Sequence, residues 1–253
     1  MSITWKKSFI ILIDLALAVY LVFAITTFNR PDELSNVCSE VKIDVKEGEV
    51  KGFLNLDEIK SQLQHARLYP LGDPMSQVSG RKIEENLSKN PLVESVQCYT
   101  TQTGRVFITL SQRLPVVRVK AENGDDYYVD THGNIMPNTQ HASDLVVVTG
   151  HVTRKYAKSV LPGVGNFLIQ NKMWRAETEQ LNILVDGSME LIPRVGDHIV
   201  YLGQPTNLDK KLSRLEKFYK YGLSKAGWNK YSYISLEFDN QIICKKNKKM
   251  NQI

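Results

Sequence analysis

The alternation of apolar and polar positions is clearest between residues 83 and 119. Ile83 and Leu87 lie four residues apart on one helical face, and Pro91 ends that helix because the residue before a proline disfavours the α region. Two runs with period-two alternation follow, separated by a turn that contains Gly104. Their apolar positions are Val96 and Cys98, then Val106, Ile108 and Leu110. The pattern predicts a helix followed by a β-hairpin with one buried face.

A strand and a helix are predicted before this unit. Val41, Ile43 and Val45 alternate with charged residues, which is typical of a strand with one solvated face. Asn55 stands three residues before Glu58 and indicates a near capping box at a helix start. The apolar face of this helix consists of Leu56, Ile59 and Leu63. The order over residues 41–110 is therefore strand, helix, helix, strand, strand.

Residues 115–245 read as a mainly β region with late helical segments. Strands are predicted at residues 116–121, 127–130, 145–149 and 198–203. A hairpin is predicted across Asp186-Gly187-Ser188, which pairs Leu181, Ile183 and Val185 with Met189 and Leu191. A short helix carries Val164, Phe167 and Leu168, and a longer helix at residues 208–226 has an apolar stripe formed by Leu208, Leu212, Leu215 and Tyr219. The expected fold class of residues 37–245 is α+β.

The last apolar run predicts one strand at residues 233–244. One parity holds Ile234, Leu236, Phe238, Ile242 and Cys244, interrupted only by Asn240. The other parity is polar, so we expect one face to pack and the other to meet water. No later strand is predicted, and this strand should form an edge of the sheet.

Residues 8–28 are long and apolar enough to cross a membrane. Twenty-one helical residues span about 31 Å, and a hydrocarbon core is about 30 Å thick. Thirteen of them are Leu, Ile, Val or Phe, and the single charge is Asp14. We expect an uncleaved anchor, because the run is too long for a signal peptide and lacks an A-x-A-like site. Cys38 stands too far from the apolar run to be a lipoprotein cysteine.

The charges that flank this span predict its orientation. Lys6 and Lys7 precede it, whereas Arg30 after it is balanced by Asp32 and Glu33. The positive-inside rule places the N-terminus in the cytoplasm and the rest of the chain across the membrane. Asp14 either faces a partner helix or reaches toward the interface.

Composition argues against most other classes of function. The net charge of +5 is modest and no helix face is lined with Lys and Arg, which disfavours nucleic-acid binding. No nucleophile elbow, Walker loop, HExxH or CxxC motif occurs, so we predict no enzyme activity, no cofactor and no metal site. The odd count of cysteines argues against a complete disulfide framework, and we interpret Cys98 and Cys244 as small apolar core residues.

Several short motifs occur in an order that resembles one family. The entry Asn90-Pro91-x-Val93-x-x-Val96 and the exit Gln112-Arg113-x-Pro115-Val116 bracket a β-α-α-β-β unit that resembles a POTRA domain. Downstream, the run at residues 127–137, YYVDTHGNIMP, and the run at residues 190–197 resemble the β domain of the FtsQ/DivIB bacterial division proteins.

The resemblance implies a domain order along the chain. It comprises a cytoplasmic tail at residues 1–7, a transmembrane helix at residues 8–28, a linker at residues 29–36, a POTRA domain at residues 37–114, a β domain at residues 115–245 and a basic tail at residues 246–253.

The resemblance also implies partners and a location. The chain would be a divisome scaffold in the bacterial inner membrane at the septum, with its C-terminus in the periplasm. It would bind FtsB/DivIC-like and FtsL-like single-span proteins and position them for septal cell-wall synthesis.

The final strand is the predicted partner-binding site, because a strand edge offers free N–H and C=O groups to an added strand. The residues assigned to it are Tyr233, Ser235, Leu236, Glu237, Phe238, Asp239, Asn240, Gln241 and Ile242. The alternative is that the tail or another strand blocks this edge. At the level of function, the alternatives are an outer-membrane assembly or secretion factor, and an exported hydrolase with unrecognised catalytic residues.

Overall fold

The computed structural model describes residues 5–28, 37–46, 54–139 and 144–247. The predicted linker at residues 29–36, and Lys248 and Lys249 of the predicted basic tail, lie outside the described residues. The chain divides into two compact units. The first comprises residues 1–44, 59–87 and 97–109, and the second comprises residues 45–58, 88–96 and 110–253.

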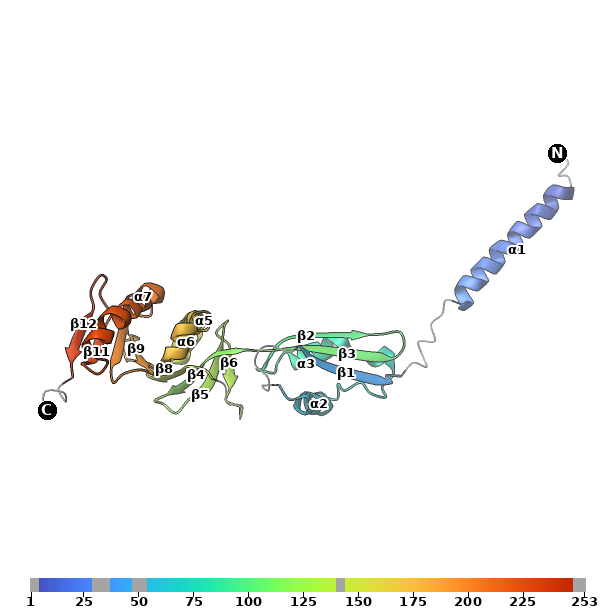
Figure 1. Ribbon diagram of the computed structural model, residues 1–253. Coiled ribbons are helices and arrows are strands. Elements are labelled where there is room, and N and C mark those ends of the chain that lie inside the picture. The colour runs from blue at the N-terminus through green and yellow to red at the C-terminus, as the bar shows by residue number, and fades with distance from the viewer. Residues whose placement is uncertain (1–4, 29–36, 47–53, 140–143, 248–253) are drawn as a thin grey trace. The chain divides into compact units, whose positions relative to one another are not determined.

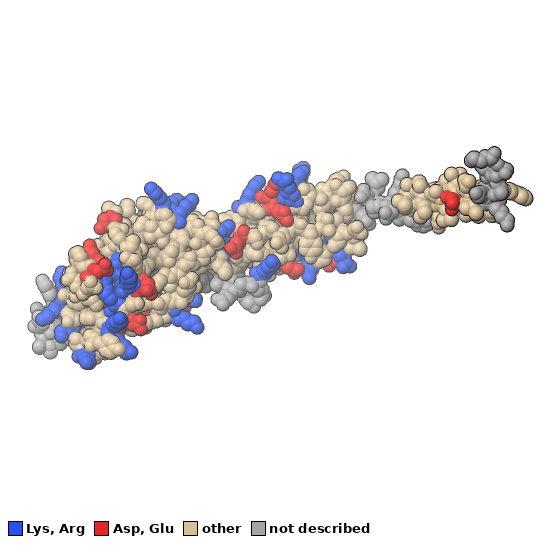
Figure 2. Space-filling view, turned by 90° about the horizontal axis from the view of Figure 1, so that it is seen from above, with Lys and Arg blue, Asp and Glu red and all other residues tan. Residues whose placement is uncertain are grey.

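The N-terminal helix α1 spans Trp5–Phe28 and begins three residues before the predicted start. Its window Phe9–Thr26 has a mean hydropathy of 2.6 and is not buried by any described part of the protein. Figure 2 shows its surface as almost free of charged groups. A helix of 24 residues is about 36 Å long, enough to cross a hydrocarbon core of about 30 Å. By length and composition α1 fits a transmembrane helix, and no other described helix does.

A three-stranded sheet in the order β1-β3-β2 follows (Figure 1). Its strands are β1, Glu40–Lys46, β2, Val93–Thr100, and β3, Arg105–Gln112. Two helices accompany it, α2, Leu56–His65, and α3, Gly80–Leu87. A 3₁₀ turn, η1, Met75–Gln77, lies between them. This order of elements confirms the predicted β-α-α-β-β unit.

The predicted apolar faces of the two helices are buried, with one exception. Ile59 and Leu63 of α2 and Ile83 and Leu87 of α3 are each at most 1% exposed. Leu56 is 48% exposed, so its assignment to the buried face is wrong. It occupies the first position of α2, next to Asn55, whose side-chain oxygen accepts a hydrogen bond from the backbone N–H of Asp57 at 2.9 Å. This bond confirms Asn55 as the N-terminal cap.

The second unit is built on a nine-stranded mixed sheet in the order β12-β11-β10-β9-β8-β7-β4-β5-β6. The strands are β4 Pro115–Ala121, β5 Asp126–Asp130, β6 Ile135–Pro137, β7 Val147–Gly150, β8 Thr178–Ile183, β9 Met189–Pro193, β10 Ile199–Gly203, β11 Tyr231–Ser235 and β12 Ile243–Lys246. Leu181 faces Leu191 and Ile183 faces Met189, which confirms the predicted hairpin. Val185 lies beyond β8 and is 82% exposed, so its place in that hairpin is wrong.

Helices cover one face of this sheet (Figure 1). They are α4 Arg154–Ser159, α5 Leu161–Gln170, α6 Lys172–Glu177, α7 Leu208–Phe218, the π-helical turn η2 Tyr219–Leu223, and α8 Ser224–Ala226. Leu212, Leu215 and Tyr219 are buried in the core that these helices share with the strands, which confirms the predicted stripe of the long helix. The helices α4 and α6, of six residues each, were not predicted.

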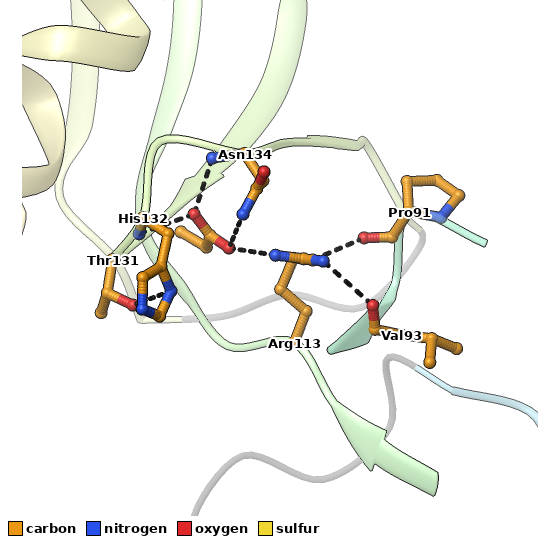
Figure 3. A network of polar contacts seen from close by, with 7 residues as sticks. Pro91, Val93, Arg113, Thr131, His132 and Asn134 are labelled. Atoms are coloured by element: carbon orange, nitrogen blue, oxygen red, sulfur yellow. Dashed lines mark hydrogen bonds and ion pairs between the residues drawn. The ribbon is translucent and has the colours of Figure 1, made fainter. Parts of the chain in front are cut away.

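A buried ion pair fixes the turn that follows β5 (Figure 3). Asp130 is 2% exposed and accepts hydrogen bonds from the backbone N–H groups of His132 and Asn134, from the Asn134 side chain and from Arg113. Arg113 also donates to the carbonyl oxygens of Pro91 and Val93, each at 3.0 Å. Burial raises the pKa of Asp130, but these hydrogen bonds together outweigh it and hold the pKa below its usual range.

Candidate partner interface at the C-terminal hairpin

The segment predicted as one strand at residues 233–244 is two strands joined by a turn, so that prediction is wrong. β11 and β12 pair antiparallel, with Ile234 opposite Cys244 and Ser235 opposite Ile243. Asn240 has a φ of 64°, in the left-handed region that asparagine tolerates better than most residues. This geometry belongs to the turn that brings the chain back along β11. The prediction that alternate apolar positions form one packed face is wrong in the turn, since Phe238 is 51% exposed.

β12 is the edge strand at this end of the sheet. β11 lies between β10, with which it is parallel, and β12, with which it is antiparallel. Among the described residues, no strand pairs with the outer edge of β12. A final edge strand is therefore confirmed, but it consists of Ile243–Lys246. Lys245 and Lys246 belong to the edge strand and are exposed.

The predicted site residues fall into three groups. Tyr233 and Ser235 lie in β11, which has strands on both sides. Leu236 is fully buried and Ile242 is half-buried against the same core. The exposed turn consists of Glu237, Phe238, Asp239, Asn240 and Gln241. The structure brings the turn residues together on the surface, but it places none of the nine in the edge strand.

Arg214 of α7 holds this turn in place. Its Nη1 donates to the carbonyl oxygens of Phe238 at 2.6 Å and Gln241 at 3.3 Å, and its Nη2 donates to the carbonyl oxygen of Leu236 at 2.9 Å. A planar guanidinium suits several acceptors at once and stays charged at any physiological pH. One side chain from the helix therefore satisfies three carbonyls of a turn that forms no ladder of its own.

A groove of about 490 Å³ opens between the helix and the turn. Its helical side is formed by Arg214, Lys217, Phe218, Tyr221 and Gly222, and its other side by Asn240, Gln241 and Ile242. Sequence reasoning missed the helical residues. A signal was present, because residues 214, 217, 218 and 221 are spaced i, i+3, i+4, i+7 and so define a second helical face beside the buried stripe.

Lys211 fixes α7 to the neighbouring strand. Its Nζ donates to the carbonyl oxygens of Leu202 at 2.7 Å and Gln204 at 2.8 Å, and the residue is 6% exposed. Burial lowers its pKa, Arg214 lowers it further, and Asp239 and Glu237 oppose both. The groove wall is thus attached to β10 as well as to the turn.

The thiols and histidines do not form a reactive cluster in the described part of the chain. Cys38, Cys98 and Cys244 are free; Cys38 is buried and the other two are half-buried. Burial raises the pKa of Cys98 to about 11, so its thiol stays protonated near neutral pH. No group of three His, Cys, Asp or Glu side chains converges among the described residues.

Comparison with known families agrees with this architecture. Residues 36–111 match the POTRA-like domain, which is the class of the first sheet and its two helices. Residues 114–245, more than half of the chain, match the family described as FtsQ/DivIB, C-terminal related. The chain belongs to the FtsQ/DivIB family. No individually curated protein matches it.

Membership of this family gives the general role. FtsQ/DivIB proteins are generally non-catalytic scaffolds of cell division that act through protein–protein contacts. With α1 at its N-terminus, the chain is a single-pass membrane protein of that class.

Proposed function

We propose that this protein is a membrane-anchored scaffold of the divisome, located in the inner membrane at the septum. In this proposal it recruits FtsB/DivIC-like and FtsL-like single-span partners for septal cell-wall synthesis. The observation that carries the proposal is the position of β12 at the end of the nine-stranded sheet. An edge strand whose N–H and C=O groups lack a neighbour is a template for an added strand, and partners that use it gain backbone hydrogen bonds.

The exposed turn and the groove extend this edge. Phe238 in the turn is 51% exposed, and Tyr221, which lines the groove, is 61% exposed. Arg214 joins the turn to the helix. Aromatic side chains with rigid, partly apolar surfaces are enriched in interfaces. In this proposal backbone pairing at β12 supplies affinity, and the turn and groove contact the side chains of the partner.

A proline scan of β12 tests the pairing. N–H groups along an antiparallel strand alternate between its two edges, so proline at successive positions removes either an internal bond to β11 or an outward donor. Of the variants Ile243→Pro, Cys244→Pro, Lys245→Pro and Lys246→Pro, those with an outward N–H should keep the fold and lose capture of the co-expressed FtsB/DivIC-like partner. Alanine at the same positions keeps every N–H and is the matched control. Wild-type capture by folded variants that have lost an outward N–H would exclude strand addition at β12.

The orientation of the chain is part of the proposal. Lys6 and Lys7 lie in the first turn of α1, before its apolar window Phe9–Thr26, so a reporter that is active only in the periplasm should work after Ile253 and fail after Lys7. The opposite activities, or cleavage that releases a soluble product, would contradict an anchor with a cytoplasmic N-terminus.

A further inference from the structure

A buried histidine connects the loop before β10 to the π-helical turn η2. His198 is 3% exposed, and its Nε2 lies 2.7 Å from the Tyr219 hydroxyl. The two rings also meet edge to face, with centroids 5.4 Å apart. Tyr219 is the first residue of η2, which contributes Tyr221 and Gly222 to the groove. One polar contact therefore joins the loop at residues 194–198 to the groove wall.

The other ring nitrogen of His198 is buried with no hydrogen-bond partner among the described residues. The loop packs tightly over it, because a Cβ on Gly196 would lie only 2.7 Å from Nδ1. Gly196 has a φ of 81°, which a side chain would also disfavour. A neutral imidazole leaves one uncharged ring nitrogen unpaired in this site. An imidazolium would leave a buried N–H⁺ donor without an acceptor, which costs far more.

The groups around this contact decide which way protonation acts. Asp197, on the same loop, favours the charged imidazole, and burial opposes it. Tyr219 keeps its proton, since burial raises its pKa, and Glu177 at the end of α6 raises it further. Trp228 packs on Tyr219 edge to face, with centroids 5.2 Å apart, and Trp174 lies 6.1 Å from Tyr219. The surroundings of the contact are largely aromatic.

We propose that His198 is a pH-sensitive switch that holds η2 in place. While its imidazole is neutral, the loop stays closed on Tyr219 and the groove wall is fixed. Protonation drives Nδ1 toward water and Asp197, which separates the loop from η2 and loosens the wall at Tyr221 and Gly222. The switch is a property of the protein alone, and any effect on partner capture rests on the proposed function.

The difference in the pKa of His198 between the closed and the opened state predicts the pH range in which the contact is lost. Burial lowers the pKa of His198, so the unfolded or opened state binds a proton first as the pH falls. The stabilisation from the closed contact is fully present above about pH 6.5, the ordinary histidine value, and is lost progressively below it. Opening should therefore become more frequent as the pH falls below about 6.5.

Hydrogen exchange on the full chain in detergent micelles tests the switch, with rates corrected for the intrinsic effect of pH. Amides of residues 196–201 and 219–223 should exchange faster at pH 5 than at pH 7, because the pKa of His198 is lowered in the closed state and protonation therefore favours the open state. His198→Gln keeps a polar side chain that does not titrate and should abolish this acceleration. His151→Gln, which removes an exposed histidine paired with Glu122, is the control and should leave it unchanged.

A second measurement covers the case in which His198→Gln does not fold. The imidazole resonance of His198 in the wild-type protein should titrate below about pH 6.5, the ordinary histidine value. Tryptophan fluorescence should change over the same pH range, because Trp174 and Trp228 both pack on Tyr219. Titration of His198 at or above the ordinary value would overturn the proposal. An equal acceleration of exchange in the wild type and in folded His198→Gln would do so as well.

Discussion

Replacing Asp130 with alanine should destabilise the second unit by about 3 kcal/mol. The substitution leaves Arg113 with its side chain 17% exposed and without its carboxylate, and it removes the acceptor of two backbone N–H groups. Removal of one partner from a buried ion pair typically costs about 3–5 kcal/mol. We expect the lower end of that range, because Arg113 keeps its bonds to the carbonyls of Pro91 and Val93.

Replacing the other partner should cost a similar amount. In Arg113→Met the Asp130 carboxylate still accepts bonds from His132 and Asn134, but the carbonyl oxygens of Pro91 and Val93 also lose their donor, so the loss is again about 3 kcal/mol. The double variant should cost less than the sum of the two, with a coupling of about 1–3 kcal/mol.

Urea unfolding of the full chain in micelles measures these differences. In a Trp5→Phe background, the remaining tryptophans, Trp174 and Trp228, report on the second unit only. The control is Asp126→Ala, which breaks the more exposed pair with Arg118 and should cost at most about 1 kcal/mol. If Asp130→Ala costs no more than Asp126→Ala, the buried network does not stabilise the unit as argued.

Three further predictions concern packing and pH. Leu87→Ala should cost about 2–5 kcal/mol and Lys89→Ala at most about 0.5, measured by thermal unfolding, since Leu87 is fully buried and Lys89 is exposed. Gly165→Ala should cost about 1–3 kcal/mol, because its Cβ would lie 2.6 Å from a valine methyl of β4, whereas Gly163→Ala, with open space around it, should be neutral or stabilising in the same assay. The lowered pKa of Asp130 means that its stabilisation is present above about pH 4 and is lost as the pH falls through the folded value, so the acid sensitivity of urea unfolding should decrease in Asp130→Asn.

The elements that sequence reasoning located are those whose burial repeats with a regular period. Leu63 lies on the apolar face of α2, Leu87 lies on that of α3, and apolar side chains occupy every second position of β3 at Val106, Ile108 and Leu110. Each of these residues is at most 1% exposed. Such patterns arise because one face of each element must leave water while the other stays hydrated. α4 and α6 were not predicted because six residues make less than two helical turns, which is too short for a helical period to be recognised.

The candidate interface shows where such reasoning fails. Leu236 and Ile242 share the parity of Ile234 and Cys244, so apolar alternation continued through a segment that is a turn. The observed conformation depends on Arg214, whose guanidinium satisfies carbonyls 22 to 27 residues further along the chain. No local pattern contains such a bond.

The two-strand hairpin changes which residues can pair with a partner. Gln241 was assigned to the final strand, but it lies in the turn, and a proline there would remove no N–H from the edge strand, which begins at Ile243. The edge available for pairing belongs to a four-residue strand that carries two lysines, features that discourage indiscriminate strand addition. A short, charged edge gives few backbone bonds, so a specific partner must gain additional affinity from side-chain contacts. The turn held by Arg214 and the groove beside it are the nearest described surfaces that offer such contacts, which is why strand, turn and groove are expected to act as one interface.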